Sequence, residues 1–278
     1  MQRPNVMRVF GIGLLGLAVL LTAAIAQAGY MTDIIDSNPL GYWRLDDASG
    51  SASAANKISG GIAGTYNNFE AADYGKPGAI KGDSDTAAGF DGSNNYISIA
   101  ESAVSTVGTG AFSVEMWFNT STSNRSDLFN YKGGDTDMGL FTDSGVLAFW
   151  STAASKYASG TTVLSPNTWY HIVLTRDATS NINAYVNGQF QFSVSGSTEN
   201  FGSVGHNIWI GANHDGNDNP SFPVSGSIDE VAIYGSAMSQ PTALAHYNAG
   251  IPVPEPSTAI LLGSALIGLI CYAWRKRK

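Results

Sequence analysis

Short apolar runs, separated by Gly, Ser, Asn and Asp, cover most of the chain between residues 41 and 234. The alternation is clearest in FSVEMWFN (residues 112–119), whose even-numbered residues are all apolar. A period of two is typical of a β-strand with one buried face, and many short strands with intervening turns are typical of a sandwich. The pattern predicts an all-β, antiparallel sandwich. The small, polar stretch 49–64 is predicted to be a loop.

Turn and cap residues divide this pattern into elements. Asn187-Gly188 lies between two apolar runs, and both residues tolerate positive φ, so we expect a two-residue hairpin turn. One short helix is predicted near the end of the β-rich region. Ser239 would cap it, Pro241 suits its first turn, and Gly250 would end it.

The N-terminal segment has the composition of an export signal. Arg3 and Arg8 precede the apolar stretch 9–25, and Ala26-Gln27-Ala28 follows it. A basic region, an apolar region and an A-x-A site define a secretory signal peptide, so residues 1–28 are predicted to be removed. An uncleaved N-terminal anchor is the alternative.

The C-terminal segment combines a stiff motif, an apolar run and a basic end. Pro254, Glu255 and Pro256 favour an extended, exposed backbone. The 17 residues from 258 to 274 carry no charge, which is just enough for a transmembrane helix. The basic residues 275–278 would stay on the cytoplasmic side. A buried helix of the globular domain is the alternative, but a terminal basic cluster has no use in a core.

Charge and cysteine content limit what the middle of the chain can do. Residues 29–252 hold 21 acidic and 8 basic residues, a formal net charge of −13. Such a surface repels the phosphates of nucleic acids, and it disfavours strongly anionic polysaccharides unless a cation bridges them. The single cysteine, Cys271, lies in the predicted span, so the exported domain is expected to have no disulfide and to rely on core burial.

The order of features in residues 251–278 resembles the PEP-CTERM sorting signal of Gram-negative bacteria that make exopolysaccharide. The resemblance implies an exosortase-type processing enzyme that recognises Pro254-Glu255-Pro256 and removes the tail. It also implies that the protein is anchored in the inner membrane before processing. Afterwards it would reside at the cell surface or in the extracellular matrix.

Several motifs in residues 29–250 occur in an order that resembles one domain family. They are YWRLDDASG, GFDGSNNYISI, GAFSVEMWFNT, NTWYHIVLTRD, IWIGANHDG and GSIDEVAIYGSAMS. Together they are similar to the laminin G-like, concanavalin A-like jelly-roll domain. The resemblance implies a jelly-roll fold but leaves the function open, because this fold is found in lectins, adhesive modules and glycosidases.

Catalytic motifs are missing from the sequence. Glycosidases need two carboxylates at a set separation, and related glucanases carry them as Glu-x-Asp-x-x-Glu on one strand. Here Glu115 is followed by Trp117 and by no second Glu. Asp229 and Glu230 are adjacent, so a regular strand would place them on opposite faces, and at least one would need donors or a cation. We therefore predict no enzymatic activity.

Calcium is the cofactor that the sequence favours. Calcium prefers oxygen ligands, and acidic clusters occur at Asp83–Asp85, Asp135–Asp137 and His214–Asn219. Asp215 and Asp218 are the first candidates, because their loop lies between two predicted strands. The alternative is that these are solvated turns, where Asp and Asn are common.

Aromatic side chains suggest a carbohydrate ligand. Trp150, Tyr157 and Trp117 are candidate platforms for sugar rings, although tryptophan in a sandwich is usually part of the core. The predicted function is an exported, non-catalytic carbohydrate-binding or adhesion module, with polysaccharide, including the producer's own exopolysaccharide, as its partner. The alternatives are a structural matrix protein that contacts other proteins and a polysaccharide-active enzyme of the same fold.

Overall fold

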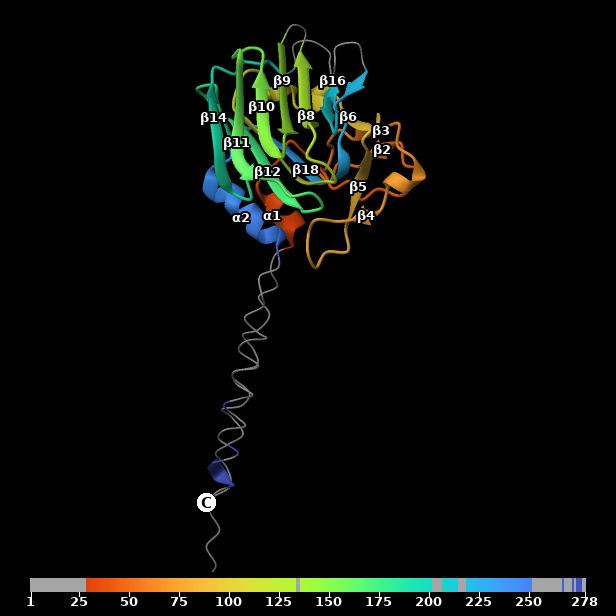
Figure 1. Ribbon diagram of the computed structural model, residues 1–278, viewed down its shortest axis with the longest axis vertical. Helices are drawn as coiled ribbons and strands as arrows, with labels where there is room; N and C mark the ends of the chain where they lie inside the picture. Colours follow the sequence, from red (N-terminus) through yellow and green to blue (C-terminus); the bar gives the residue numbers. More distant parts are fainter. Residues whose placement is uncertain are drawn as a thin grey trace, which may run out of the picture. The chain divides into compact units, whose positions relative to one another are not determined.

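Two antiparallel sheets, here called sheet A and sheet B, pack face to face in the computed structural model (Figure 1). The structure describes residues 29–133, 136–201, 207–214 and 219–251, together with 267, 272 and 274–276. Tyr30–Ile251 form one compact unit. The architecture confirms the predicted antiparallel jelly-roll sandwich.

Sheet A has eight strands in the order β14-β13-β12-β7-β18-β5-β4, with β1 paired to β18. Its strands are β1 (Gly41–Trp43), β4 (Lys76–Pro77), β5 (Thr86–Asp91), β7 (Phe112–Thr120), β12 (Tyr170–Arg176), β13 (Asn181–Val186), β14 (Gln189–Ser195) and β18 (Ser225–Tyr234). The predicted alternation in β7 is confirmed, since Val114 and Phe118 belong to the core between the sheets, whereas Trp117 packs on the other side.

Sheet B also has eight strands, in the order β11-β10-β9-β8-β15-β6-β3-β2. They are β2 (Ser53–Ala54), β3 (Gly64–Asn67), β6 (Tyr96–Ile99), β8 (Ser126–Gly133), β9 (Thr136–Asp143), β10 (Val146–Ser151), β11 (Lys156–Val163) and β15 (Ile208–Ile210). A separate pair is formed by β16 (Asn213–His214) and β17 (Pro220–Ser221). The predicted loop 49–64 is therefore partly strand, because β2 pairs with β3.

Two helices lie against the outer face of sheet A and bury a second apolar cluster. They are α1 (Tyr30–Asp36) and α2 (Gln240–Gly250). Ile34 and Ala243 from the helices pack with Trp117 and Val173 from the sheet. The predicted cap is confirmed, since Ser239 Oγ accepts from the backbone N–H of Thr242. The short α1 was not expected from the sequence.

The predicted hairpin turn joins β13 to β14. Asn187 has φ 52° and Gly188 has φ 71°, as a two-residue hairpin with both central residues at positive φ requires. The predicted signal peptide (1–28) lies outside the described residues, as does most of the predicted sorting segment (251–278). None of the helices in the described part of the chain has the length and apolar character needed to cross a membrane.

Candidate functional site: the outer face of sheet B

One row of paired residues crosses five neighbouring strands of sheet B. Tyr157 of β11 lies opposite Trp150 of β10, and Trp150 lies opposite Gly139 of β9. Gly139 in turn faces Asn130 of β8, and Asn130 faces Trp209 of β15. Figure 1 shows β11, β10, β9 and β8 side by side. The row brings aromatic and amide side chains from distant parts of the sequence onto one face.

Trp150 and Tyr157 expose their rings at one end of this row. Trp150 is 39% exposed and Tyr157 is 51% exposed. Their position follows from the alternation of β10, in which Leu147 and Phe149 point into the core between the sheets. Because the Cβ atoms of directly paired residues lie about 5 Å apart, the two side chains are neighbours on the outer face of sheet B. The structure brings together these two residues singled out in the sequence.

Next to the exposed rings lies Phe141, which is only 2% exposed and has an arginine over its ring. The rings of Tyr157 and Phe141 are 6.0 Å apart. The Arg125 guanidinium lies 4.2 Å from the centroid of Phe141 and 4.1 Å from that of Phe222. Phe222 is 47% exposed. We call Trp150, Tyr157, Phe141, Arg125 and Phe222 the aromatic strip.

A fully buried carboxylate fixes the arginine of the strip. Arg125 donates from Nε to Asp127 Oδ1 at 2.8 Å and from Nη2 to Oδ2 at 3.1 Å. Asp127 is 0% exposed. Burial raises the pKa of Asp127, although the hydrogen bonds and charge of Arg125 act in the opposite direction. The two-point contact holds the guanidinium plane between the rings of Phe141 and Phe222.

Polar groups form the floor beside the strip. Asn130 donates from Nδ2 to Asp137 Oδ1 at 3.0 Å, and its own Oδ1 accepts from the backbone of His214. Gly139 lies between Asn130 and Trp150 in the row, and a Cβ added there would make only ordinary contacts, the nearest at 3.4 Å. The far end of the row is closed, since Trp209 stacks on Tyr96 at 3.8 Å and is only 3% exposed.

The third predicted aromatic lies elsewhere. Trp117 is 2% exposed and packs beneath the helices, with Tyr30 at 6.3 Å and Tyr247 at 5.8 Å. The prediction that Trp117 offers a ring to a ligand is corrected, because α1 and α2 cover the outer face of β7. The candidate calcium ligands Asp215 and Asp218 lie outside the described residues, as do Pro254, Glu255 and Pro256 of the sorting motif.

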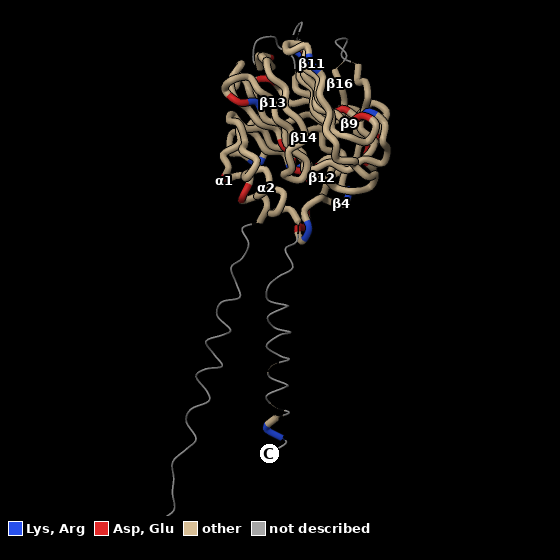
Figure 2. The backbone as a smooth tube through the Cα atoms, turned by 60° about the vertical axis from the view of Figure 1, so that its left-hand side comes forward, with Lys and Arg blue, Asp and Glu red and all other residues tan. Residues whose placement is uncertain are grey.

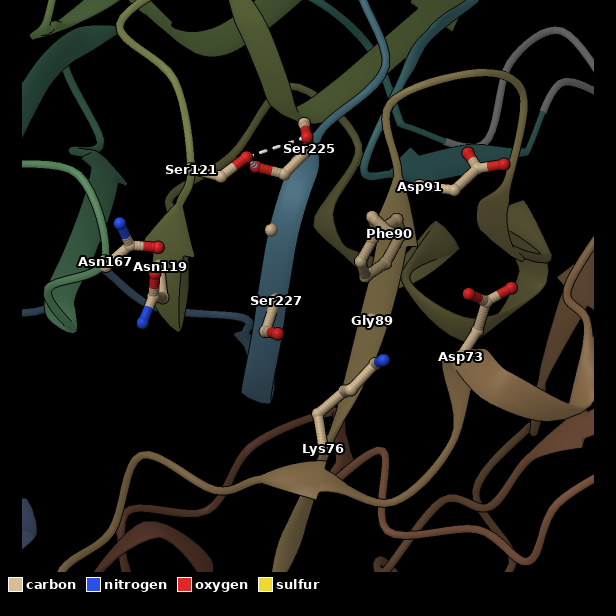
Figure 3. A pocket seen from close by; sticks show the side chains of 11 residues that line it. Asp73, Lys76, Gly89, Phe90, Asp91, Asn119, Ser121, Asn167, Ser225 and Ser227 are labelled. Atoms are coloured by element: carbon tan, nitrogen blue, oxygen red, sulfur yellow. Dashed lines mark hydrogen bonds between the residues drawn. The ribbon is translucent and has the colours of Figure 1, made fainter.

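A second concavity lies near one end of sheet A. Asp73, Lys76, Asp91, Asn119, Asn167 and Ser227 are among the residues that line this open cleft of about 510 Å³ (Figure 3). Its two carboxylates support the local chain, since Asp91 accepts from the backbone of Ser93 and Asp73 accepts from that of Glu70. The ring of Phe90, the aromatic residue of the lining, is only 4% exposed. The cleft therefore lacks an accessible stacking surface.

A buried polar network connects sheet A to α2. Glu115 Oε2 lies 2.8 Å from His171 Nε2, and His246 Nδ1 lies 3.0 Å from both Glu115 oxygens. The hydroxyl of Tyr234 donates to the same carboxylate. Burial opposes ionisation of Glu115, but the hydrogen bonds and charges of the two histidines lower its pKa to about 2. Glu115 and His171 are 0% exposed and His246 is 4% exposed, so the network attaches the helix through a carboxylate that solvent does not reach.

Three members of the strip were not identified from the sequence. Phe141 alternates with the core residue Leu140 in β9, and this alternation could have placed Phe141 on the outer face of sheet B. Arg125 precedes β8 and Phe222 follows β17, so both lie in connecting segments whose position no periodicity fixes. Only the packing of these segments on sheet B shows that Arg125, Phe141 and Phe222 meet.

Comparison with known proteins supports the fold and the C-terminal motif. Residues 91–243 match the family model for the concanavalin A-like lectin/glucanases superfamily. Residues 252–278 match the model for the PEP-CTERM protein-sorting motif, which indicates export and sorting. No curated protein matches the chain.

Solved structures with the same fold include a domain in complex with a sugar and a receptor binding domain. Domain 4 of AbnA, an extracellular arabinanase from Geobacillus stearothermophilus solved with arabinotriose, has a TM-score of 0.54 at 18% identity. That match covers 75% of this chain and 98% of that one. The receptor binding domain of botulinum neurotoxin D has a TM-score of 0.55 at 14% identity, covering 77% of this chain and 53% of that one. At these identities the likeness concerns the fold alone. The family model spans more than half of the chain, and the chain therefore belongs to the concanavalin A-like lectin/glucanases superfamily.

Proposed function

We propose that this protein is an exported, non-catalytic carbohydrate-binding protein that binds polysaccharide on its aromatic strip. The observation that carries the proposal is the direct pairing of Trp150 with Tyr157 and the exposure of both rings. Soluble proteins seldom leave adjacent large rings exposed unless they bind something. The rings offer flat apolar faces on which sugar rings can stack.

The charge of the domain favours a neutral glycan. Residues 29–252 carry a formal net charge of −13, and Figure 2 shows its basic residues as isolated positions along the tube. Anionic polymers would be repelled unless a cation bridges them. Arg125 is the cation of the strip, and its charge is offset by Asp127. An electrically neutral polysaccharide, including a neutral exopolysaccharide of the producing cell, fits this surface best.

The geometry argues against hydrolysis at the same site. Retaining and inverting glycosidases both need two carboxyl groups that reach the substrate. Asp127 is fully buried with both oxygens bonded to Arg125, and Asp137 accepts from Asn130. Asp127 is therefore not free to act as an acid or nucleophile, and a pair of catalytic carboxyl groups would have to form without it. The arabinotriose complex of the AbnA domain is a precedent for a sugar ligand on this fold.

The test is binding of the full-length chain, purified in mild detergent, to a glycan panel that includes the host's exopolysaccharide. Trp150→Ala should weaken binding at least about tenfold, equal to about 1.4 kcal/mol. Phe190→Ala is the matched control, because Phe190 is 51% exposed but belongs to sheet A. Binding should be measured with calcium and with chelator, since the proposed ligands Asp215 and Asp218 predict calcium dependence.

The outcomes separate the candidate functions. Binding that is lost in Trp150→Ala and kept in Phe190→Ala supports the aromatic strip. Absence of binding to every glycan would overturn the proposal and favour a structural protein that contacts other proteins. Release of shortened sugars from the panel would show a polysaccharide-active enzyme. In each case the exosortase-type processing enzyme stays the proposed partner of Pro254-Glu255-Pro256.

A further inference from the structure

A buried acidic cluster lies on the other sheet, where β18 departs from regular geometry. The register of β18 against β7 shifts between Asp229 and Ala232, and Glu230 has φ 57°. A regular strand would direct Asp229 and Glu230 to opposite faces, as the sequence predicted. That prediction is wrong, because one carboxylate oxygen from each meets one from Asp85 within 4.8 Å.

Arg44 is the cation that the structure places against these three carboxylates. It donates to Glu230 Oε1 from Nε at 3.0 Å and from Nη2 at 2.8 Å. The same Nη2 lies 2.8 Å from Asp85 Oδ2. The hydroxyl of Tyr42 donates to Glu230 Oε2. Both carboxylate oxygens of Glu230 thus accept hydrogen bonds. The single positive charge of Arg44 faces the three carboxylates of the cluster.

Asp229 and Asp85 both have carboxylate oxygens without a hydrogen-bond partner among the described residues, but Asp85 pairs with Arg44 and Asp229 does not. Asp229 therefore has the least compensation. Its side chain is 0% exposed. Oδ2 accepts from the backbone N–H of Ala79 at 2.7 Å, but Oδ1 has no hydrogen-bond partner among the residues that the structure describes. A buried carboxylate oxygen without a donor is costly, and a cation is the usual remedy. Burial also raises the pKa of Asp229, Glu230 and Asp85.

We infer that Asp85, Asp229 and Glu230 bind one calcium ion, with Asp229 Oδ1 as the ligand that the fold leaves open for it. The donors are all carboxylate oxygens, which suit a hard divalent cation and not zinc or copper. Ligands on calcium lie at about 2.3–2.6 Å, so two of them are at most about 5 Å apart. The 4.8 Å limit within this cluster matches that spacing.

The ion joins segments that are far apart in the sequence. Asp85 lies in the connection between β4 and β5, and Ala79 in the same connection donates to Asp229. Asp229 and Glu230 both belong to β18. Arg44, which follows β1, contacts both Asp85 and Glu230. Calcium would therefore stabilise the packing of the first part of the domain on its last strand. The side chain of Asp83, which also pairs with Arg44, is 30% exposed and marks the solvent side of the cluster.

The experiment measures calcium binding by calorimetry and thermal unfolding of the full-length chain in mild detergent. We expect a Tm increase of about 5–10 °C at a calcium concentration about 100 times Kd. Asp229→Asn keeps the shape of the side chain and should weaken calcium binding at least about tenfold. Asp36→Asn removes an exposed carboxylate from α1 and should leave calcium binding unchanged.

Further measurements test whether the effect of calcium arises at this cluster. In chelator, Asp229→Asn should be at least as stable as the unsubstituted chain, because it removes an uncompensated buried charge. Its circular dichroism then verifies that the variant is folded. The double variant Asp215→Asn/Asp218→Asn should keep the Tm increase. Loss of the increase in the double variant, with retention in Asp229→Asn, would overturn the inference, as would a chain that neither binds calcium nor changes its Tm.

Discussion

His246 of α2 lies with Nδ1 3.0 Å from both carboxylate oxygens of Glu115, a residue of the central strand β7. Its Nε2 lies 3.0 Å from Ser37 Oγ, just after α1. Burial alone would lower the pKa of His246, but the hydrogen bond and charge of Glu115 raise it above 6.5. One side chain thus couples both helices to sheet A through a group that titrates.

This coupling predicts stability that declines on both sides of an intermediate pH. Glu115 has a folded pKa of about 2, below 4.5, so its contribution is complete above pH 4.5 and is lost as the pH falls towards 2. His246 has a raised pKa, so its contribution is complete below pH 6.5 and is lost as the pH rises through the folded value. Urea unfolding across this range gives the free energy of unfolding.

Two variants test whether His246 is the group whose titration lowers stability on the alkaline side. His246→Gln should remove most of the decline in stability on the alkaline side. Ser37→Ala loses the hydrogen bond to Nε2 but keeps the pair with Glu115, so its alkaline decline should match that of the unsubstituted chain. An unchanged pH profile in His246→Gln would show that another group is responsible.

Arg125 and Asp127 should behave as a coupled pair. Arg125→Gln leaves the fully buried Asp127 carboxylate without its partner and should cost about 2–4 kcal/mol of unfolding free energy. Asp127→Asn in the same chain should restore much of that loss, because the charge that needed compensation is gone. Urea unfolding of both single variants and the double variant completes the cycle. Strictly additive losses would contradict the coupling.

Tyr157 should contribute to binding through its ring face. Tyr157→Phe keeps the ring and should bind within about twofold of the unsubstituted chain, whereas Tyr157→Ala should bind several-fold more weakly. Isothermal titration with the best glycan from the panel measures both. If Tyr157→Phe binds as weakly as Tyr157→Ala, the hydroxyl is the important group, and the stacking model for Tyr157 is wrong.

Glu255 should control processing of the tail. Glu255→Ala removes the acidic residue of the Pro-Glu-Pro motif and should leave a larger species in the membrane fraction. Immunoblots of membrane and released fractions in a host that has the exosortase-type system measure this. Ser257→Ala, two residues away, is the matched control and should be processed normally. Normal processing of Glu255→Ala would exclude the sorting model.

Local patterns in the sequence predicted the β-sandwich and part of the candidate site. Period-two alternation placed the core face of β7, and Asn187-Gly188 placed the hairpin. Trp150 and Tyr157 were singled out because they flank a short polar stretch, but their direct pairing between β10 and β11 was not predicted. Each of the predicted features is set by residues close together in the chain.

Features that depend on distant segments were not predicted. Trp117 is covered because α1 packs on α2 and on β7, and the seven residues of α1 carry little helical pattern. The strip gains Arg125 and Phe222 only through tertiary packing. The bulge at Glu230 requires positive φ at a residue other than glycine, and no feature of the neighbouring sequence predicts it. Asp229 and Glu230 were therefore assigned to opposite faces.

The attachment of α2 also determines how the domain would carry mechanical load. The Gly250 carbonyl accepts from the backbone N–H of Lys81, and the ring of Trp117 leaves no space for a Cβ at Gly250. The sorting motif begins at residue 252, directly after this contact. Tension on that end would enter through α2 and pass along the chain to β18, which is held between β7 and β5. Such a force would have to shear a central strand, whereas an edge strand could be peeled away one hydrogen bond at a time.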